Sequence, residues 1–154
     1  MSRPLTLDPA LIGWHLAHGD PVSCEVVDKL PGDRGGIPAR VDGKLCVLEE
    51  FRIPSSFDPA SVRVFNTNVF HFDAAALERL DIPWTYFKVS KKVDGESVIQ
   101  FERLVNEVTS FLPSRYLLVP RSGAESRFLP VKDQQELEQR HAEIELVARA
   151  RGML

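Results

Sequence analysis

The fold is decided by the run Ser23-Cys24-Glu25-Val26-Val27-Asp28-Lys29, which leads directly into a glycine-containing loop at residues 31–36. A short apolar run of this kind, bounded by turn residues, predicts a buried β-strand. Before it, residues 7–18 have the pattern of a helix, which Asp8 can cap and Gly19 can end. The chain is therefore expected to begin with a helix followed by a buried strand.

Strand and helix patterns alternate along the rest of the chain. The dipeptides Asp42-Gly43 and Asp94-Gly95 each separate two strand-like runs and predict β-hairpins. The runs beside these turns are residues 37–41 and 44–51 for the first hairpin, and 84–90 and 97–101 for the second. The other expected elements are strands at 62–72 and 116–119, and helices at 74–80, 102–111 and 133–152. This alternation predicts an α/β fold, and the hairpins indicate a mixed sheet.

The composition is that of a globular protein, because 44% of the 154 residues are hydrophobic and 27% are charged. The net charge of −3 argues against a general nucleic-acid binder, which normally carries a basic excess. No apolar run approaches the ~18 residues of a membrane span, and residues 1–10 hold no apolar signal core. Cys24 and Cys46 lie in apolar strand-like runs, which predicts buried free thiols in a reducing, cytoplasmic environment. Neither nucleic acid nor membrane is therefore an expected partner.

Motifs that carry chemistry are few when the residues are considered alone. The sequence has no G-x-G-x-x-G or Walker loop, which would cradle phosphates. The four histidines are scattered without zinc-ligand spacing, so no metal site is expected from these residues.

Three features have both a structural and a functional interpretation, and a fourth has a structural one. Gly35-Gly36 either forms a tight turn or lets the backbone approach a ligand closely. Asn66 and Asn68 either form a turn or bulge in a strand, or present carboxamides that read a sugar hydroxyl. Lys132 is either a solvated lysine or a phosphate contact beside a helix N-terminus, which favours anions. Lys91-Lys92 lies on a hairpin flank and can be a solvated strand end.

Two longer motifs are more specific, namely Phe65-Asn66-Thr67-Asn68 and Arg127-Phe128-Leu129-Pro130-Val131-Lys132. Further motifs accompany them in a fixed order: Cys24-Glu25-Val26-Val27-Asp28-Lys29 with Gly35-Gly36, Gly43-Lys44-Leu45 with Leu48-Glu49 and Ile53-Pro54, Lys91-Lys92-Val93-Asp94-Gly95 with Val98-Ile99-Gln100-Phe101-Glu102, and Val119-Pro120-Arg121. Their residues and order resemble those of UTP–glucose-1-phosphate uridylyltransferases, also called UDP-glucose pyrophosphorylases. The resemblance covers roughly residues 10–133.

This resemblance implies a mixed-sheet part of a nucleotide-diphospho-sugar transferase (Rossmann-like) fold, a single partial domain over residues 1–154. It implies that UTP and glucose 1-phosphate react to UDP-glucose and pyrophosphate with the help of Mg²⁺. Lys132 would contact the phosphates as the catalytic lysine. Seven residues would bind substrate: Glu49 and the asparagines Asn66 and Asn68 at the sugar, Gly35 and Gly36 in the loop over the hexose, and Lys29 and Lys91 near the phosphates.

The chain departs from the family pattern in two places. Residues 122–126 lengthen the connection between Arg121 and Arg127, which changes the expected setting of Arg121. The family's glycine-rich nucleotide loop and its magnesium-binding aspartate belong upstream of Met1. A companion chain or segment is therefore expected to supply the glycine-rich half, and the isolated chain is expected to be inactive or weakly active.

Two other functions stay open on the sequence. The chain can be a non-catalytic module that binds a UDP-sugar or a sugar phosphate. It can also be a truncated fragment or structural piece whose exposed sheet edge favours association.

Overall fold

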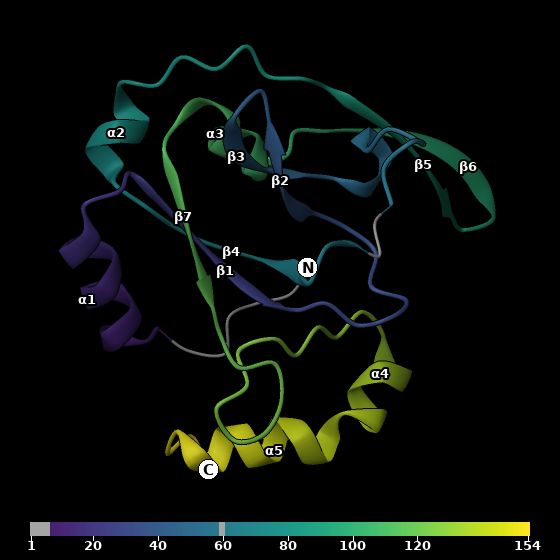
Figure 1. Ribbon diagram of the computed structural model, residues 1–154. Helices are drawn as coiled ribbons and strands as arrows, with labels where there is room; N and C mark the ends of the chain where they lie inside the picture. The colour runs from purple at the N-terminus through teal and green to yellow at the C-terminus, as the bar shows by residue number, and fades with distance from the viewer. Residues whose placement is uncertain (1–6, 59–60) are drawn as a thin grey trace.

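The computed structural model describes residues 7–58 and 61–154, and its centre is a three-stranded sheet with strand order β4-β1-β7. The middle strand β1 (Val22–Asp28) pairs antiparallel with β4 (Val64–Phe72) and parallel with β7 (Ser114–Leu118) (Figure 1). The predicted α/β class with a mixed sheet is confirmed. The mixed character arises from the parallel β1–β7 pair, which no hairpin signal in the sequence indicated.

The two predicted hairpins are present, but each forms a separate two-stranded sheet. The first joins β2 (Ile37–Val41) to β3 (Lys44–Leu48), and the second joins β5 (Phe87–Val93) to β6 (Glu96–Glu102). In both turns the Asp-Gly residues have positive φ, between 48° and 85°. Two-residue turns of this conformation match the right-handed twist of the flanking strands, which is why Asp-Gly predicted them correctly.

Helix ends follow the predicted caps. Helix α1 (Pro9–His18) begins after Asp8, whose carboxylate accepts the amide of Ala10 at 2.9 Å, and ends at Gly19 with φ 67°. Helix α2 (Ala74–Glu78) begins after Asp73, which accepts the amide of Ala75 at 2.8 Å. In the described part of the chain, no helix has the length and apolarity needed to cross a bilayer.

Several predicted elements have different bounds; the strand expected at 84–90, for example, is β5 at Phe87–Val93. The expected helix at 102–111 is wrong, because Glu102 still belongs to β6 and only a 3-10 turn, η3 (Val105–Glu107), and the short α3 (Val108–Phe111) follow. The expected helix at 133–152 is two helices, α4 (Gln134–Gln139) and α5 (His141–Ala150). Arg140 separates them with φ −97° and ψ 4°, outside helical geometry. Strand β3 ends at Leu48 and a 3-10 turn, η1 (Glu50–Arg52), follows.

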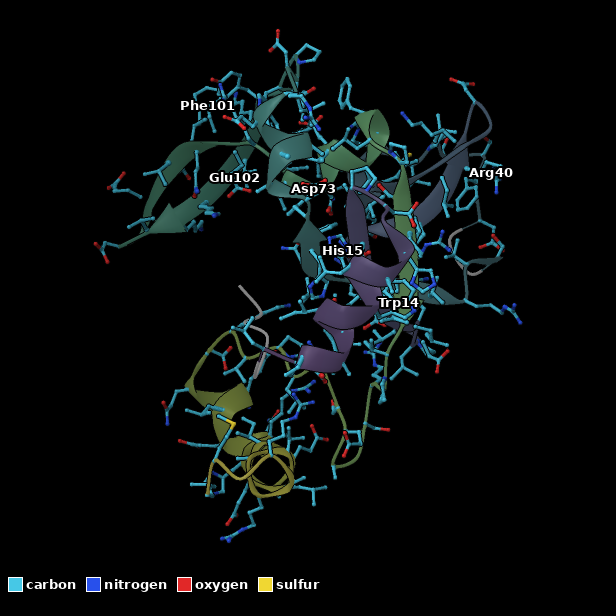
Figure 2. The ribbon with its side chains drawn as sticks, turned by 90° about the vertical axis from the view of Figure 1, so that its left-hand side faces the viewer. Trp14, His15, Arg40, Asp73, Phe101 and Glu102 are labelled. Atoms are coloured by element: carbon cyan, nitrogen blue, oxygen red, sulfur yellow. The ribbon has the colours of Figure 1, made fainter. Side chains whose placement is uncertain are left out.

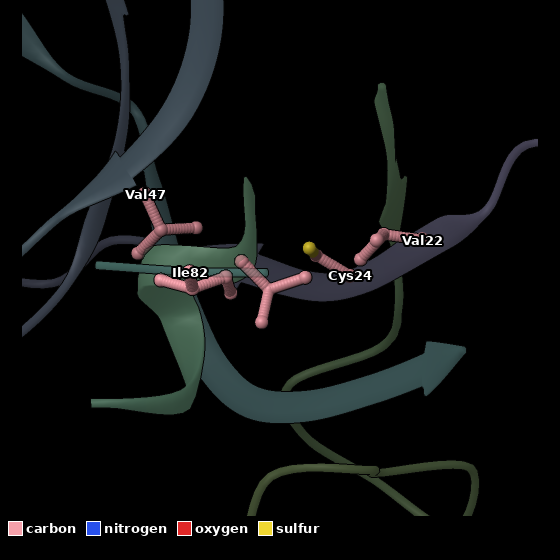
Figure 3. Close-up of a cluster of buried hydrophobic side chains, with 5 residues drawn as sticks. Val22, Cys24, Val47 and Ile82 are labelled. Carbon is pink, nitrogen blue, oxygen red and sulfur yellow. The ribbon is translucent and has the colours of Figure 1, made fainter. Parts of the chain in front are cut away.

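The hydrophobic core lies on both sides of β1. Figure 3 shows the first cluster, in which Val22 and Cys24 of β1 meet Val47 of β3 and Ile82. The second cluster lies around Val27, on the opposite face of the strand, and contains Ile37, Phe65 and Val119. Because both faces of β1 are covered, the strand reads as a nearly continuous apolar run.

Both cysteines are buried and free, as predicted. Burial raises the pKa of the Cys24 thiol to about 12, because the charged thiolate loses its solvation.

One residue of this strand, Glu25, is charged and buried, and it pairs with Arg127 from a distant loop. Arg127 donates from Nε to Glu25 Oε2 at 2.6 Å and from Nη2 to Glu25 Oε1 at 2.8 Å. Only 1% of the Glu25 side chain and 6% of the Arg127 side chain are exposed. His71 Nε2 lies 3.0 Å from Glu25 Oε1. The pair joins the middle of the sheet to the loop before α4.

We expect Arg127→Met to lower the free energy of unfolding by about 3–5 kcal/mol, because it leaves the Glu25 carboxylate buried without its charge partner. Urea unfolding followed by circular dichroism measures this. Arg115→Ala is the control, since the Arg115–Asp20 pair is largely exposed and its loss should cost less than about 1 kcal/mol. Equal losses in the two variants would show that the buried pair has no special role.

Candidate functional site

A cavity of about 420 Å³ opens between the glycine loop after β1, strand β4 and the segment that precedes α4. In Figure 1 the loop after β1 and the segment before α4 run close together at the same side of the sheet. The structure brings six of the predicted site residues to this cavity: Gly35, Gly36, Glu49, Asn66, Asn68 and Lys132.

Gly36 is a position where the packing excludes a side chain. A Cβ atom there would lie 2.8 Å from Val47 Cγ1, 3.0 Å from Glu49 Oε1 and 3.2 Å from Asn66 Nδ2. Its carbonyl accepts the Asn66 amide at 2.9 Å, which joins the glycine loop to β4. The groups packed against Gly36 belong to the protein itself, so a close approach of the backbone to a ligand stays a prediction.

Gly35 is glycine for a conformational reason. Its φ of 140° is rarely adopted by residues with a side chain, and a Cβ would also lie 3.2 Å from the Phe65 ring. The pair therefore lets the loop lie flat against β4.

Asn68 has φ 65°, and its amide donates to Asn66 Oδ1 at 3.1 Å. The β1–β4 register shifts at this point, opposite Glu25 and Val26. The structural interpretation of the asparagines as a turn-like bulge is thus correct. The bulge also leaves Asn68 exposed at the cavity, and no described residue hydrogen-bonds its carboxamide. A free donor and acceptor at this position suits a hydroxylated ligand, so a sugar contact stays a prediction.

Glu49 follows β3 and lies beside Gly36, half-buried in the cavity wall. Its Oε1 accepts a hydrogen bond from Asn106 Nδ2, whereas no described residue donates to Oε2. Burial raises the pKa of the Glu49 carboxyl; the Asn106 bond opposes this rise and the charge of Glu50 adds to it. One carboxylate oxygen is therefore oriented by the protein while the other can accept from a ligand.

Lys132 is exposed at the cavity, and its ammonium pairs with no described residue. Arg34 in the glycine loop is also exposed at the cavity, and its guanidinium group pairs with no described residue. The expected help from a helix N-terminus is less than predicted, because Asp133 accepts the Glu136 amide and Glu136 accepts the Lys132 amide, both at 2.8 Å. Two cations without partners remain at the cavity, where they favour an anion such as a phosphate.

Arg121 connects the glycine loop to the segment after β7. Its guanidinium donates to both Asp33 oxygens, at 2.6 and 2.8 Å, and to the Asp28 carbonyl at 2.7 Å. Burial alone would raise the pKa of Asp33, but the hydrogen bonds from Arg121 and Leu30 and the charges of Arg121 and Lys29 outweigh it and lower that pKa. The longer connection at 122–126 therefore still places Arg121 at the cavity, as an anchor of the loop.

Two of the predicted substrate-binding lysines lie elsewhere. Lys29 follows β1 and is not among the cavity-lining residues. Lys91 lies on the β5–β6 hairpin, which projects from the body of the molecule, and Phe101 and Glu102 lie near its base, at the end away from the Asp94-Gly95 turn (Figure 2). Its ammonium donates to Gln100 at 2.7 Å and to Glu102 at 3.0 Å. The structure gives neither lysine a place in the cavity, and their roles stay predictions.

Three residues that contribute to the cavity were not selected from the sequence. Arg34 directly precedes the glycine pair but belongs to no motif that the sequence analysis used. Arg121 lay in a recognised motif without a role, and Asn106 had no signal because its distance from Glu49 in the sequence is 57 residues. Among residues 7–58 and 61–154, no group of three His, Cys, Asp or Glu side chains could hold a metal ion.

A family model for UTP–glucose-1-phosphate uridylyltransferases matches residues 5–145. The chain belongs to this family. No match was found among curated protein sequences. The family assignment agrees with the order of the asparagine motif and the Arg-Phe-Leu-Pro-Val-Lys motif along the chain.

Several solved structures of similar fold are those of UDP-glucose pyrophosphorylases. A UDP-glucose phosphorylase from Trypanosoma brucei has a TM-score of 0.68 and 24% identity, with 86% of this chain and 32% of that chain covered. Two UDP-glucose pyrophosphorylase variants from Leishmania major, one in complex with UDP-glucose, have TM-scores of 0.63 and 0.61 and identities of 21% and 22%. Each comparison covers 86% of this chain and 33% of the other. The chain described here thus spans about a third of the length of these proteins.

We expect Gly36→Ala to destabilise the chain by about 1–3 kcal/mol, because the added methyl group overpacks the contact between the loop and β4. Chemical denaturation measures the effect. Gly13→Ala is the matched control: this helical glycine has nothing within 4 Å of a Cβ, so the change should stabilise by about 0.4–1 kcal/mol. A neutral Gly36→Ala would mean that the loop moves freely away from Glu49 and Asn66.

Proposed function

We propose that this chain forms the sugar and phosphate side of a uridylyltransferase that makes UDP-glucose and pyrophosphate from UTP and glucose 1-phosphate. The observation that carries the proposal is the convergence of the glycine pair, Glu49, Asn68 and Lys132 on one cavity. The family assignment and the UDP-glucose complex of a Leishmania major relative support it.

The cavity divides into two chemical regions. Glu49 Oε2 and the Asn68 carboxamide offer acceptors and donors that suit hexose hydroxyl groups. Arg34 and Lys132 offer positive charge for phosphate groups, and Lys132 is the proposed catalytic lysine. A hexose 1-phosphate joins both functions in one molecule, so it fits this arrangement.

In the proposed reaction, a phosphate oxygen of glucose 1-phosphate attacks the α-phosphorus of UTP. The bond from this phosphorus to the bridging oxygen breaks, and pyrophosphate leaves with its electron pair. Such transfers depend on positioning and charge neutralisation. The cations of this chain would hold the attacking phosphate and stabilise negative charge that develops near it.

The nucleotide side of the reaction needs groups that these 154 residues do not contain. The sequence has no glycine-rich phosphate loop, and the described residues form no cluster that could hold a metal ion. Magnesium, which the family implies, thus does not fit the described residues, and no step is assigned to it. We propose that a glycine-rich half, on the same polypeptide or on a companion chain, completes the site in the cytoplasm.

A second function is favoured by the mixture of carboxamide, carboxylate and cationic side chains that line the same cavity. A cavity with hexose-binding and phosphate-binding groups can bind a UDP-sugar or a sugar phosphate without turning it over. The two functions differ in one measurable respect, because only the first yields pyrophosphate once the nucleotide half is present.

We expect the isolated chain with UTP, glucose 1-phosphate and magnesium to release pyrophosphate far below the rate of a complete enzyme. The reason is the lack of a phosphate-binding loop in these residues. An enzyme-coupled pyrophosphate assay measures this, with the chain plus its glycine-rich half as the positive control. Full turnover by the isolated chain would contradict the division of the site into two halves.

In the complete enzyme, Lys132→Ala should lower kcat/KM at least tenfold, about 1.4 kcal/mol of transition-state stabilisation. The loss follows from removing an unpaired ammonium group beside the attacking phosphate. Lys92→Ala is the control, because Lys92 is an exposed lysine on β5 outside the cavity. If both variants keep the wild-type value, Lys132 has no catalytic role.

A further inference from the structure

We propose that Asn106 is a positioning residue that orients the Glu49 carboxylate toward the hexose. Asn106 lies in η3, is 3% exposed, and donates from Nδ2 to Glu49 Oε1. The motifs of the family resemblance place Glu49 at the sugar but assign nothing to Asn106. The inference rests on the proposed function for the identity of the ligand, and on the geometry of the free chain for the rest.

The turn that carries Asn106 holds the segment around Glu49 from both sides. Before Glu49, the Val47 amide donates to Thr109 Oγ1 at 2.9 Å, and the same hydroxyl donates to the Asn106 carbonyl at 2.7 Å. After Glu49, Arg52 donates to Glu107 Oε1 at 3.2 Å. Thr109 of α3 therefore holds the backbone before Glu49, Glu107 of η3 holds the Arg52 side chain after it, and Asn106 of η3 holds the Glu49 side chain.

The opposite side of Glu49 is closed by the glycine loop. Glu49 Oε1 and Asn66 Nδ2 both lie close to Gly36, at 3.0 and 3.2 Å from the position a Cβ would take. With Oε1 held between Asn106 and this loop, Oε2 has no partner among the described residues. The carboxylate is thus presented in one orientation before any ligand arrives, which reduces the entropy lost on binding.

The Asn106 amide also favours the charged form of Glu49. A donor bonded to a carboxylate lowers its pKa, here against the opposing effects of burial and of Glu50. The Arg52–Glu107 pair lies beside it, and the other charged groups that line the cavity are Arg34, Lys132, Glu136, Arg140 and the Arg121–Asp33 pair. Loss of the amide therefore raises the pKa of Glu49, and ionised Glu49 is then lost at a higher pH.

The test compares wild type with Asn106→Leu, which keeps the number and branching of the side-chain heavy atoms, and with Asn106→Ala. Carbon-13 NMR titration of the Glu49 carboxyl in the ligand-free chain should show a midpoint about one pH unit higher in both variants. Arg52→Met is the matched control, because it breaks the neighbouring contact of the same turn and leaves the Asn106 bond intact. Its Glu49 midpoint should stay at the wild-type value.

Calorimetric binding of UDP-glucose and of glucose 1-phosphate to the same proteins adds the functional readout. We expect the Asn106 variants to bind about tenfold more weakly at neutral pH, with the acid limb of binding moved to higher pH. An unchanged Glu49 midpoint, or a midpoint moved equally by Arg52→Met, overturns the role of Asn106 whatever the ligand. A wild-type chain that binds neither sugar, while the midpoints move as expected, overturns the proposed function instead.

Discussion

The buried pair between Glu25 and Arg127 joins the two parts of the chain that form the cavity. Glu25 lies in the central strand, and Arg127 lies in the loop that leads to Lys132. Burying either charge alone would cost several kcal/mol, so each requires the other in this geometry. The Arg127 amide also donates to the Pro120 carbonyl at 2.9 Å, which closes the loop on itself. The position of the proposed catalytic lysine is therefore linked to the middle of the sheet.

The cavity combines a rigid region with a more exposed one. The groups proposed to contact the sugar lie at strand ends and in packed turns, where Gly36 lies close to Glu49 and Asn66, and Asn106 donates to Glu49. The phosphate-facing cations lie on exposed loops with no protein partner among the described residues. Groups that discriminate hydroxyl positions need fixed geometry, whereas a long cation can follow a phosphate over a larger range. Fixed polar groups beside mobile cations are what a ligand with both a hexose and a phosphate requires.

Membership in a motif does not by itself place a residue at the cavity. Six of the eight residues that the resemblance assigns line one cavity, although in the sequence they extend from Gly35 to Lys132. Lys29 and Lys91 also belong to motifs of the resemblance, but they do not line this cavity. For Lys91 the reason is that the β5–β6 hairpin projects from the body, so that the lysine bonds to its cross-strand neighbours.

Local chemistry in the sequence determined the caps at Asp8 and Asp73, the Asp-Gly hairpins and the buried strand β1, because each depends on neighbouring residues. Tertiary structure decided the rest. Residues 102–111 have helical spacing, yet pairing with β5 keeps Glu102 in a strand and leaves only short turns after it. The sequence also indicated which motifs belong to the family. Only folding could bring Asn106 to Glu49 and Arg127 to Glu25, because buried polar groups find their partners through space and leave no spacing signal along the chain.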